Sequence, residues 1–150
     1  MSKFSSSEME RLAKLLGKEH TLYEQIRKLT QQQTQLLAKD DIEEFNDSLD
    51  KREELIEKIK GLHQESDALV QSYTSYAEAG TGNNEIDKLR SDIRELVQIC
   101  VNLNDDNIMA MREKTDDHSK KIDEQSAKRK GIGGYAQSVP NTPEMFDKKT

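Results

Sequence analysis

The sequence is poor in the residues that interrupt helices or cross-link small folds: it has two prolines, seven glycines and one cysteine among 150 residues, and no tryptophan. A single cysteine excludes a disulfide framework and a zinc site made of cysteines, so a reducing cytoplasm is the expected location. No run approaches the ~18 apolar residues of a membrane span, and residues 1–12 lack the apolar region of a secretory signal. The sequence therefore predicts a cytoplasmic protein without membrane insertion.

Apolar residues are also scarce, because 33% of the chain is hydrophobic and 5% aromatic, against 35% charged. Ordinary soluble domains carry roughly 45–50% apolar and 25% charged residues. So few apolar side chains do not fill a broad core, but they fill narrow seams between long helices. The net charge of −6 argues against nucleic acid as the main partner, although residues 128–150 hold five Lys/Arg and only two Asp/Glu.

Capping signals and apolar heptads divide the chain into three long helices, predicted at residues 8–38, 41–79 and 84–127. Apolar residues recur at alternating spacings of three and four, which is typical of helices that pack narrow stripes on one another. Each start is predicted from a polar residue with an acidic residue three positions later: Ser7 with Glu10, Asp40 with Glu43, and Asn84 with Asp87. The short link between the first two spans predicts an antiparallel hairpin.

The expected seams consist of one stripe on each helix. In the first helix the stripe is Leu12, Leu15, Leu22, Ile26, Leu29 and Leu36, with Glu19 and Gln33 at the remaining positions; in the second it is Ile42, Phe45, Leu49, Ile56, Ile59, Val70 and Tyr73; in the third it is Ile86, Leu89, Ile93, Leu96, Cys100 and Leu103.

The third stripe thins after residue 103, where Asn104, Asn107, Lys114 and His118 occupy positions that favour leucine. Such polar positions form either a hydrated layer or a surface that stays soluble without its partner. Because helical stability comes mainly from packing an apolar face, residues 104–127 are expected to be labile and to lack a partner within their own chain. An incompletely packed helix of this kind is suited to binding another helix.

Residues 130–150 form a separate segment with three glycines, two prolines and no apolar periodicity. This composition predicts a flexible tail. Its apolar anchors are Tyr135, Met145 and Phe146. The tail is either inert, or its last two anchors cover the 97–111 stripe until a ligand displaces them, or it is part of the binding site.

No residue pattern points to catalysis, and the sequence predicts no enzyme, no cofactor and no metal. His20, His63 and His118 fall on three different helices without ligand spacing, and solvated or seam-edge positions are expected for them. Cys100 lies on the apolar stripe, which favours a small core residue over a reactive thiol. The glycines at 131–134 lack the strand and the Lys-Ser/Thr pair of a phosphate-binding loop.

A leucine-rich first helix, an acidic break and a charged second helix follow one another along the chain, and the tail ends in a short charged motif. The residues concerned are Leu12, Leu15, Leu16, Glu19, Tyr23 and Leu29; the run from Leu36 to Phe45; the run from Lys51 to Ile56; and Phe146-Asp147-Lys148-Lys149. In the order of these segments the chain resembles the FlgN family of flagellar type III export chaperones.

The spacing predicts an all-α protein in which an elongated antiparallel hairpin and a long third helix form a three-helix, coiled-coil-like bundle. Residues 1–129 are then the helical chaperone domain and residues 130–150 the tail. The resemblance implies an all-helical cytoplasmic protein. It implies a chaperone that binds the C-terminal helical ends of hook–filament junction proteins, prevents their premature polymerisation and delivers them to the export apparatus. The alternatives are a structural coiled-coil homo-oligomer and an adaptor of another secretion system. The residues expected to bind cargo are Ile93, Leu96, Val97, Cys100, Leu103, Asn104, Asn107, Ile108 and Met111.

Overall fold

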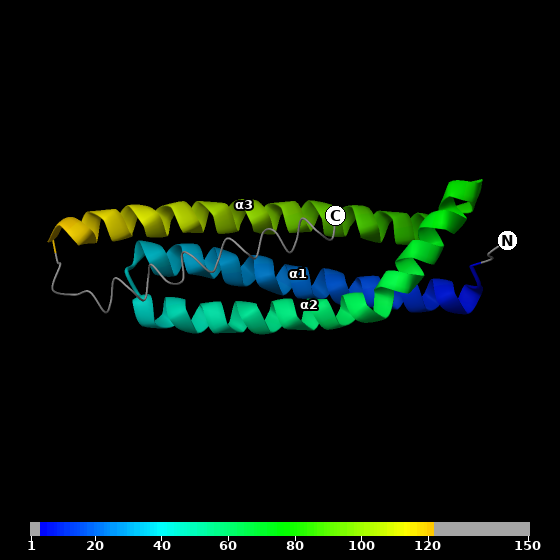
Figure 1. Ribbon diagram of the computed structural model, residues 1–150, viewed down its shortest axis with the longest axis horizontal. Coiled ribbons are helices and arrows are strands. Elements are labelled where there is room, and N and C mark those ends of the chain that lie inside the picture. The colour runs from blue at the N-terminus through cyan, green and yellow to red at the C-terminus, as the bar shows by residue number, and fades with distance from the viewer. Residues whose placement is uncertain (1–3, 122–150) are drawn as a thin grey trace. The chain divides into compact units, whose positions relative to one another are not determined.

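The computed structural model describes residues 4–121 and, within that range, not the side chains of Thr81 and residues 117–121. The elements are α1 (Ser6–Ala38), α2 (Ile42–Tyr76), the wide helical turn η1 (Ala77–Thr81) and α3 (Asn84–Lys121) (Figure 1). No strand occurs in this range, so the predicted all-α class is confirmed. The remainder of the predicted third helix and the tail anchors Tyr135, Met145 and Phe146 lie outside the described residues.

All three helix starts use caps one or two residues away from the predicted ones. Ser5 and Glu8 form the capping box of α1: the Ser5 hydroxyl accepts from the Glu8 N–H, and the Glu8 carboxylate accepts from the Ser5 N–H, both at 3.1 Å. Asp41 caps α2 by accepting from the N–H of Glu44 at 3.2 Å. Because several adjacent residues offer equivalent capping oxygens, the sequence alone did not select among them.

The third cap is Asn83, whose side-chain oxygen accepts from the Ile86 N–H at 3.1 Å. The predicted caps Ser7, Asp40 and Asn84 are therefore wrong, because Ser5, Asp41 and Asn83 cap the three helices instead.

Asp40 instead ends α1 in a left-handed conformation with φ 56°. The N–H of Asp41 donates to the Leu36 carbonyl at 3.0 Å, and that of Asp40 to the Leu37 carbonyl at 3.2 Å. These two bonds make a Schellman ending, in which glycine is the usual residue at the left-handed position and aspartate is among the few tolerated alternatives. The acidic Asp40-Asp41 pair thus closes one helix and opens the next.

The described chain divides into two compact units. Among the described residues, unit 1 contains residues 4–26 and 49–96, and unit 2 contains residues 27–48 and 97–121. Each unit combines parts of all three helices, so each has its own seam.

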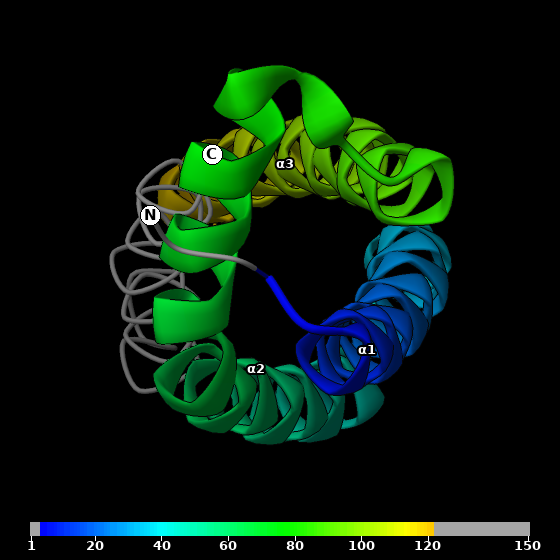
Figure 2. The same ribbon diagram turned by 90° about the vertical axis from the view of Figure 1, so that its right-hand side faces the viewer.

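Unit 1 buries a mostly apolar seam. In the end-on view, its parts of α1, α2 and α3 are arranged in a ring (Figure 2). Twelve of its buried side chains are apolar: Phe4, Leu12, Leu15, Leu16, Tyr23, Ile26, Ile56, Ile59, Tyr73, Ile86, Ile93 and Leu96. The buried polar side chains of this unit are Glu19, Arg52, His63 and Ser66.

An aromatic cluster around Tyr73 closes the end of unit 1 where α2 leads into α3. The Tyr73 hydroxyl donates to Asp87 Oδ1 and accepts from the N–H of Asn83, both at 2.7 Å. Burial, and then the hydrogen bond to Asp87, raise the pKa of Tyr73 above its usual value of 10.0. The ring of Phe4 meets Tyr73 edge to face, with centroids 5.6 Å apart. Gly80, with φ 99°, occupies the left-handed position of η1, the wide turn that follows α2.

Unit 2 has a smaller apolar seam with proportionately more polar side chains. Its buried apolar residues are Leu36, Leu37, Phe45, Val97, Cys100, Val101, Ile108 and Met111, and its buried polar ones are Thr30, Gln33, Ser48, Asn104 and Asn107. We refer to these five residues as the polar layer. The placement of Gln33 and the two asparagines in the seam follows the predicted heptad, whereas Thr30 and Ser48 were not predicted there.

Candidate functional site

The residues expected to bind cargo are mostly buried, in the unit to which each belongs. In unit 1, Ile93 and Leu96 are 7% and 5% exposed. In unit 2, six are buried and Leu103 is half-buried; the buried ones are Val97, Cys100, Asn104, Asn107, Ile108 and Met111. The expectation that α3 lacks a partner beyond residue 103 is therefore wrong within the described residues.

One backbone and one side-chain group of α1 explain why this part of α3 packs. Asn107 Nδ2 donates to the Thr30 backbone carbonyl at 3.0 Å, and the Thr34 hydroxyl donates to Asn107 Oδ1 at 2.6 Å. Residues 30 and 34 are one helical turn apart, so both can meet the same asparagine. The sequence signal for this contact is Thr34 alone, because a backbone carbonyl is available at every residue.

A charged pair joins the turn between α1 and α2 to α3. Lys114 donates to the carboxylate of Asp40, whose side chain remains 59% exposed. Pairs this exposed contribute little to stability, about 0–1 kcal/mol. The pair therefore contributes little to holding α3 against this turn in unit 2.

Two amide groups of the polar layer have no hydrogen-bond partner among the described residues. They are Gln33 Nε2 and Asn104 Nδ2. A buried polar group that lacks its hydrogen bond costs about 1–3 kcal/mol. The seam of unit 2 is therefore less stable than its burial alone indicates.

The outer side of α3 carries the exposed large apolar side chains of the described chain. Ile99 is 45% exposed and Met109 is 61% exposed, and both belong to unit 2. The prediction did not include either residue, because neither lies on the heptad stripe.

The remaining candidates do not form a chemical site. Cys100 is fully buried, as its place on the stripe predicted. His63 was expected at a solvated or seam-edge position but is buried in unit 1, where its Nε2 lies 3.0 Å from Glu19 Oε2. His20 is half-buried, and the side chain of His118 is not described. Within the described residues no cluster of His, Cys, Asp or Glu is suited to a metal ion.

The three long helices and the buried seam of each unit define an all-α protein with bundle-like packing. The chain belongs to the FlgN family, since the family model described as FlgN protein matches residues 8–129. This family comprises flagellar export chaperones, which bind export substrates during flagellar assembly. Comparisons with curated proteins and with solved structures give no match. None of the helices described between residues 4 and 121 combines the length and apolarity of a bilayer crossing.

Proposed function

We propose that this chain is a cytoplasmic chaperone for the C-terminal helical ends of hook–filament junction proteins. It keeps these ends from polymerising prematurely and delivers them to the type III export apparatus. The proposed cargo surface is the α3 stripe, which consists of Ile93, Leu96, Val97, Cys100, Leu103, Asn104, Asn107, Ile108 and Met111.

Because this stripe is buried, cargo must replace the chain's own helices on it. In unit 2 the segments to be replaced are residues 27–38 of α1 and 42–48 of α2. An apolar stripe that exchanges one helical partner for another stays buried in both states, so most of its burial, worth ~25 cal/mol per Å2, is retained. The cargo helix has only to bind somewhat better than the segments that it displaces.

The observation that carries this proposal is the polar layer. The unpartnered amides of Gln33 and Asn104 lower the stability of the closed arrangement and regain hydrogen bonds when unit 2 opens to water or to a polar cargo residue. Segments of low stability are the usual source of binding elements that move.

A covalent lock across the closed unit 2 tests the proposal. The chain Asp40→Cys, Lys114→Cys, with Cys100→Ala, is joined by a short bis-maleimide at the positions of the present ion pair. Affinity for a C-terminal helical peptide of a hook–filament junction protein is measured before and after linking. We expect the lock to weaken binding about tenfold or more, since α3 can no longer leave its partners.

The matched control places the same linker within one helix. Glu57 and Lys60 form an exposed pair on α2, and linking Glu57→Cys to Lys60→Cys in the Cys100→Ala chain should leave cargo affinity unchanged. Equal affinity of the locked and unlocked chains would contradict an exchange on the stripe. If Ile99→Asp or Met109→Asp alone abolished binding, the cargo site would have to be assigned to the outer side of α3 instead. A homo-oligomer whose mass is indifferent to the peptide would favour the structural alternative.

A further inference from the structure

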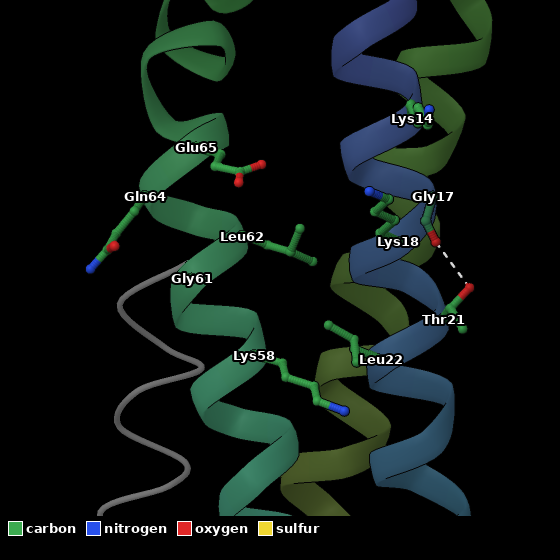
Figure 3. Close-up of a pocket in the computed structure, with 10 residues that line it drawn as sticks. All are labelled: Lys14, Gly17, Lys18, Thr21, Leu22, Lys58, Gly61, Leu62, Gln64 and Glu65. Carbon is green, nitrogen blue, oxygen red and sulfur yellow. Dashed lines mark hydrogen bonds between the residues drawn. The ribbon is translucent and has the colours of Figure 1, made fainter.

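A second surface lies within unit 1, on α1 and α2, whereas the proposed cargo stripe is on α3. A groove between α1 and α2 has a volume of about 990 Å3 and is lined by ten residues (Figure 3). We call it the lysine groove; it consists of Lys14, Gly17, Lys18, Thr21 and Leu22 of α1, and Lys58, Gly61, Leu62, Gln64 and Glu65 of α2.

Each wall of the groove contains a glycine in the middle of a long helix. Gly17 lies in α1 and Gly61 in α2, where glycine is the least favourable residue after proline. A Cβ atom at either position would meet no atom within 4 Å, and neither glycine has a positive φ. Neither packing nor backbone conformation within the described chain therefore requires a glycine at these positions. Two such glycines leave room for another backbone to approach both helices closely.

The floor of the groove is apolar and its rim is basic. Leu22 and Leu62 are half-buried, and each points from its helix towards the other (Figure 3). Lys18 and Lys58 extend into the same space. Among residues 4–121 no ion pair engages either of them, nor Lys14. With one glutamate among three lysines, the groove is locally positive on a chain of net charge −6.

We propose that the lysine groove docks an acidic amphipathic helix of a partner protein. Leucine-like side chains of the partner would contact Leu22 and Leu62, its backbone would pass over the glycines, and its flanking carboxylates would pair with the lysines. On α1 the lining runs from Lys14 to Leu22, a rise of roughly 12 Å at ~1.5 Å per residue, so the partner helix needs at least two to three turns. Helix-in-groove recognition of this kind combines apolar anchors with complementary charge.

A second copy of this chain is a poorer occupant. A two-fold contact through the groove would place its lysines against the same lysines of the other copy, because such an interface joins the same patch on both subunits. Like charges held together in an interface oppose association. The positive rim thus selects a different, acidic surface.

The experiment uses the full chain and two labelled helical peptides of three heptads. Both have leucine at positions a and d; one has glutamate at e and g, and the other lysine. Like-charged flanks keep each peptide from pairing with itself. Fluorescence anisotropy at low salt should show the acidic peptide binding about tenfold or more tightly than the basic one.

Two kinds of variant separate charge from shape. The change Lys18→Glu with Lys58→Glu should weaken binding of the acidic peptide about tenfold, whereas Lys28→Glu with Lys88→Glu, the same charge change at exposed lysines outside the groove, should have little effect. The change Gly17→Leu with Gly61→Leu should also weaken binding about tenfold, while the melting temperature stays equal or rises because leucine favours helix. Binding loss therefore cannot be attributed to unfolding.

Several outcomes would overturn the proposal: no binding of the acidic peptide, equal binding of both peptides, equal effects of groove and control lysines, or an unchanged affinity in the double leucine variant. An unchanged affinity in the double leucine variant would mean that charge alone attracts the peptide. Junction-protein peptide binding should be retained in all these variants, so failure here is distinguishable from failure of the proposed cargo function.

Discussion

Units 1 and 2 use segments of the same three helices but bury different kinds of side chain. Unit 1 buries twelve apolar and four polar side chains, among them Tyr23 and Tyr73, which are both 0% exposed. Unit 2 buries eight apolar and five polar side chains. Both units hold buried polar atoms without a hydrogen bond among the described residues, including His63 Nδ1 in unit 1 and the amides of Gln33 and Asn104 in unit 2. The heptad spacing is the same in both, so the difference lies in what occupies the seam. Segments of the same helices can thus bury seams of different polarity, and under the proposed function the more polar seam is the one that exchanges partners.

The largest expected contrast comes from apolar truncation in each unit. Leu12→Ala in unit 1, at a side chain 0% exposed, should lower the free energy of unfolding by about 2–5 kcal/mol. Met111→Ala in unit 2 should cost less, about 1–2 kcal/mol, because the polar seam accommodates water more readily. Urea denaturation measures both losses, and hydrogen exchange locates them. The exposed Met109→Ala is the control and should stay within about 0.5 kcal/mol. Equal losses at the two buried sites would remove the distinction between the units.

An intermediate effect is expected from removing the polar character of unit 2. The double change Gln33→Leu and Asn104→Leu eliminates both unpartnered amides and should raise the free energy of unfolding by about 1–3 kcal/mol. The same change should weaken cargo binding, since the closed arrangement gains stability. Gln31→Leu with Asn102→Leu repeats the chemistry at exposed positions of the same helices and should alter neither quantity appreciably. Destabilisation of the buried double variant would show that these amides are satisfied in solution.

The smallest effect concerns pH and is confined to unit 1. Folding keeps the Tyr73 phenol protonated and raises its pKa above the usual 10.0, so its stabilising contribution is present below about pH 10. It is lost as the pH rises through the higher pKa of the folded state, because the unfolded chain ionises more readily. Melting curves of the chain and of Tyr73→Phe should therefore converge above pH 10. Tyr76→Phe is the control. If the melting temperatures of the unchanged chain and of Tyr73→Phe stayed the same distance apart at every pH, the assigned bond to Asp87 would be contradicted.

Much of the fold could be predicted from residue spacing. The heptads and the near absence of glycine and proline inside them specify three helices, and the Asp40-Asp41 break specifies a sharp turn, because these are properties of neighbouring residues. The seam positions of Glu19 and Gln33 were predictable for the same reason and are confirmed by their burial. Arg52, His63 and Ser66 were missed, because polar side chains at seam positions look like solvated ones until their surroundings are known.

The sequence by itself determined the helical class, the approximate turns and the FlgN family pattern, since each depends on the order and spacing of residues along the chain. Tertiary structure decided which of several adjacent polar residues caps each helix, and whether the later part of α3 has a partner. Asn107 illustrates the reason: alone it weakens a seam, but opposite Thr30 and Thr34 it completes one. The value of a buried polar group depends on whether another segment brings it a hydrogen bond, and that segment lies more than seventy residues away in the chain.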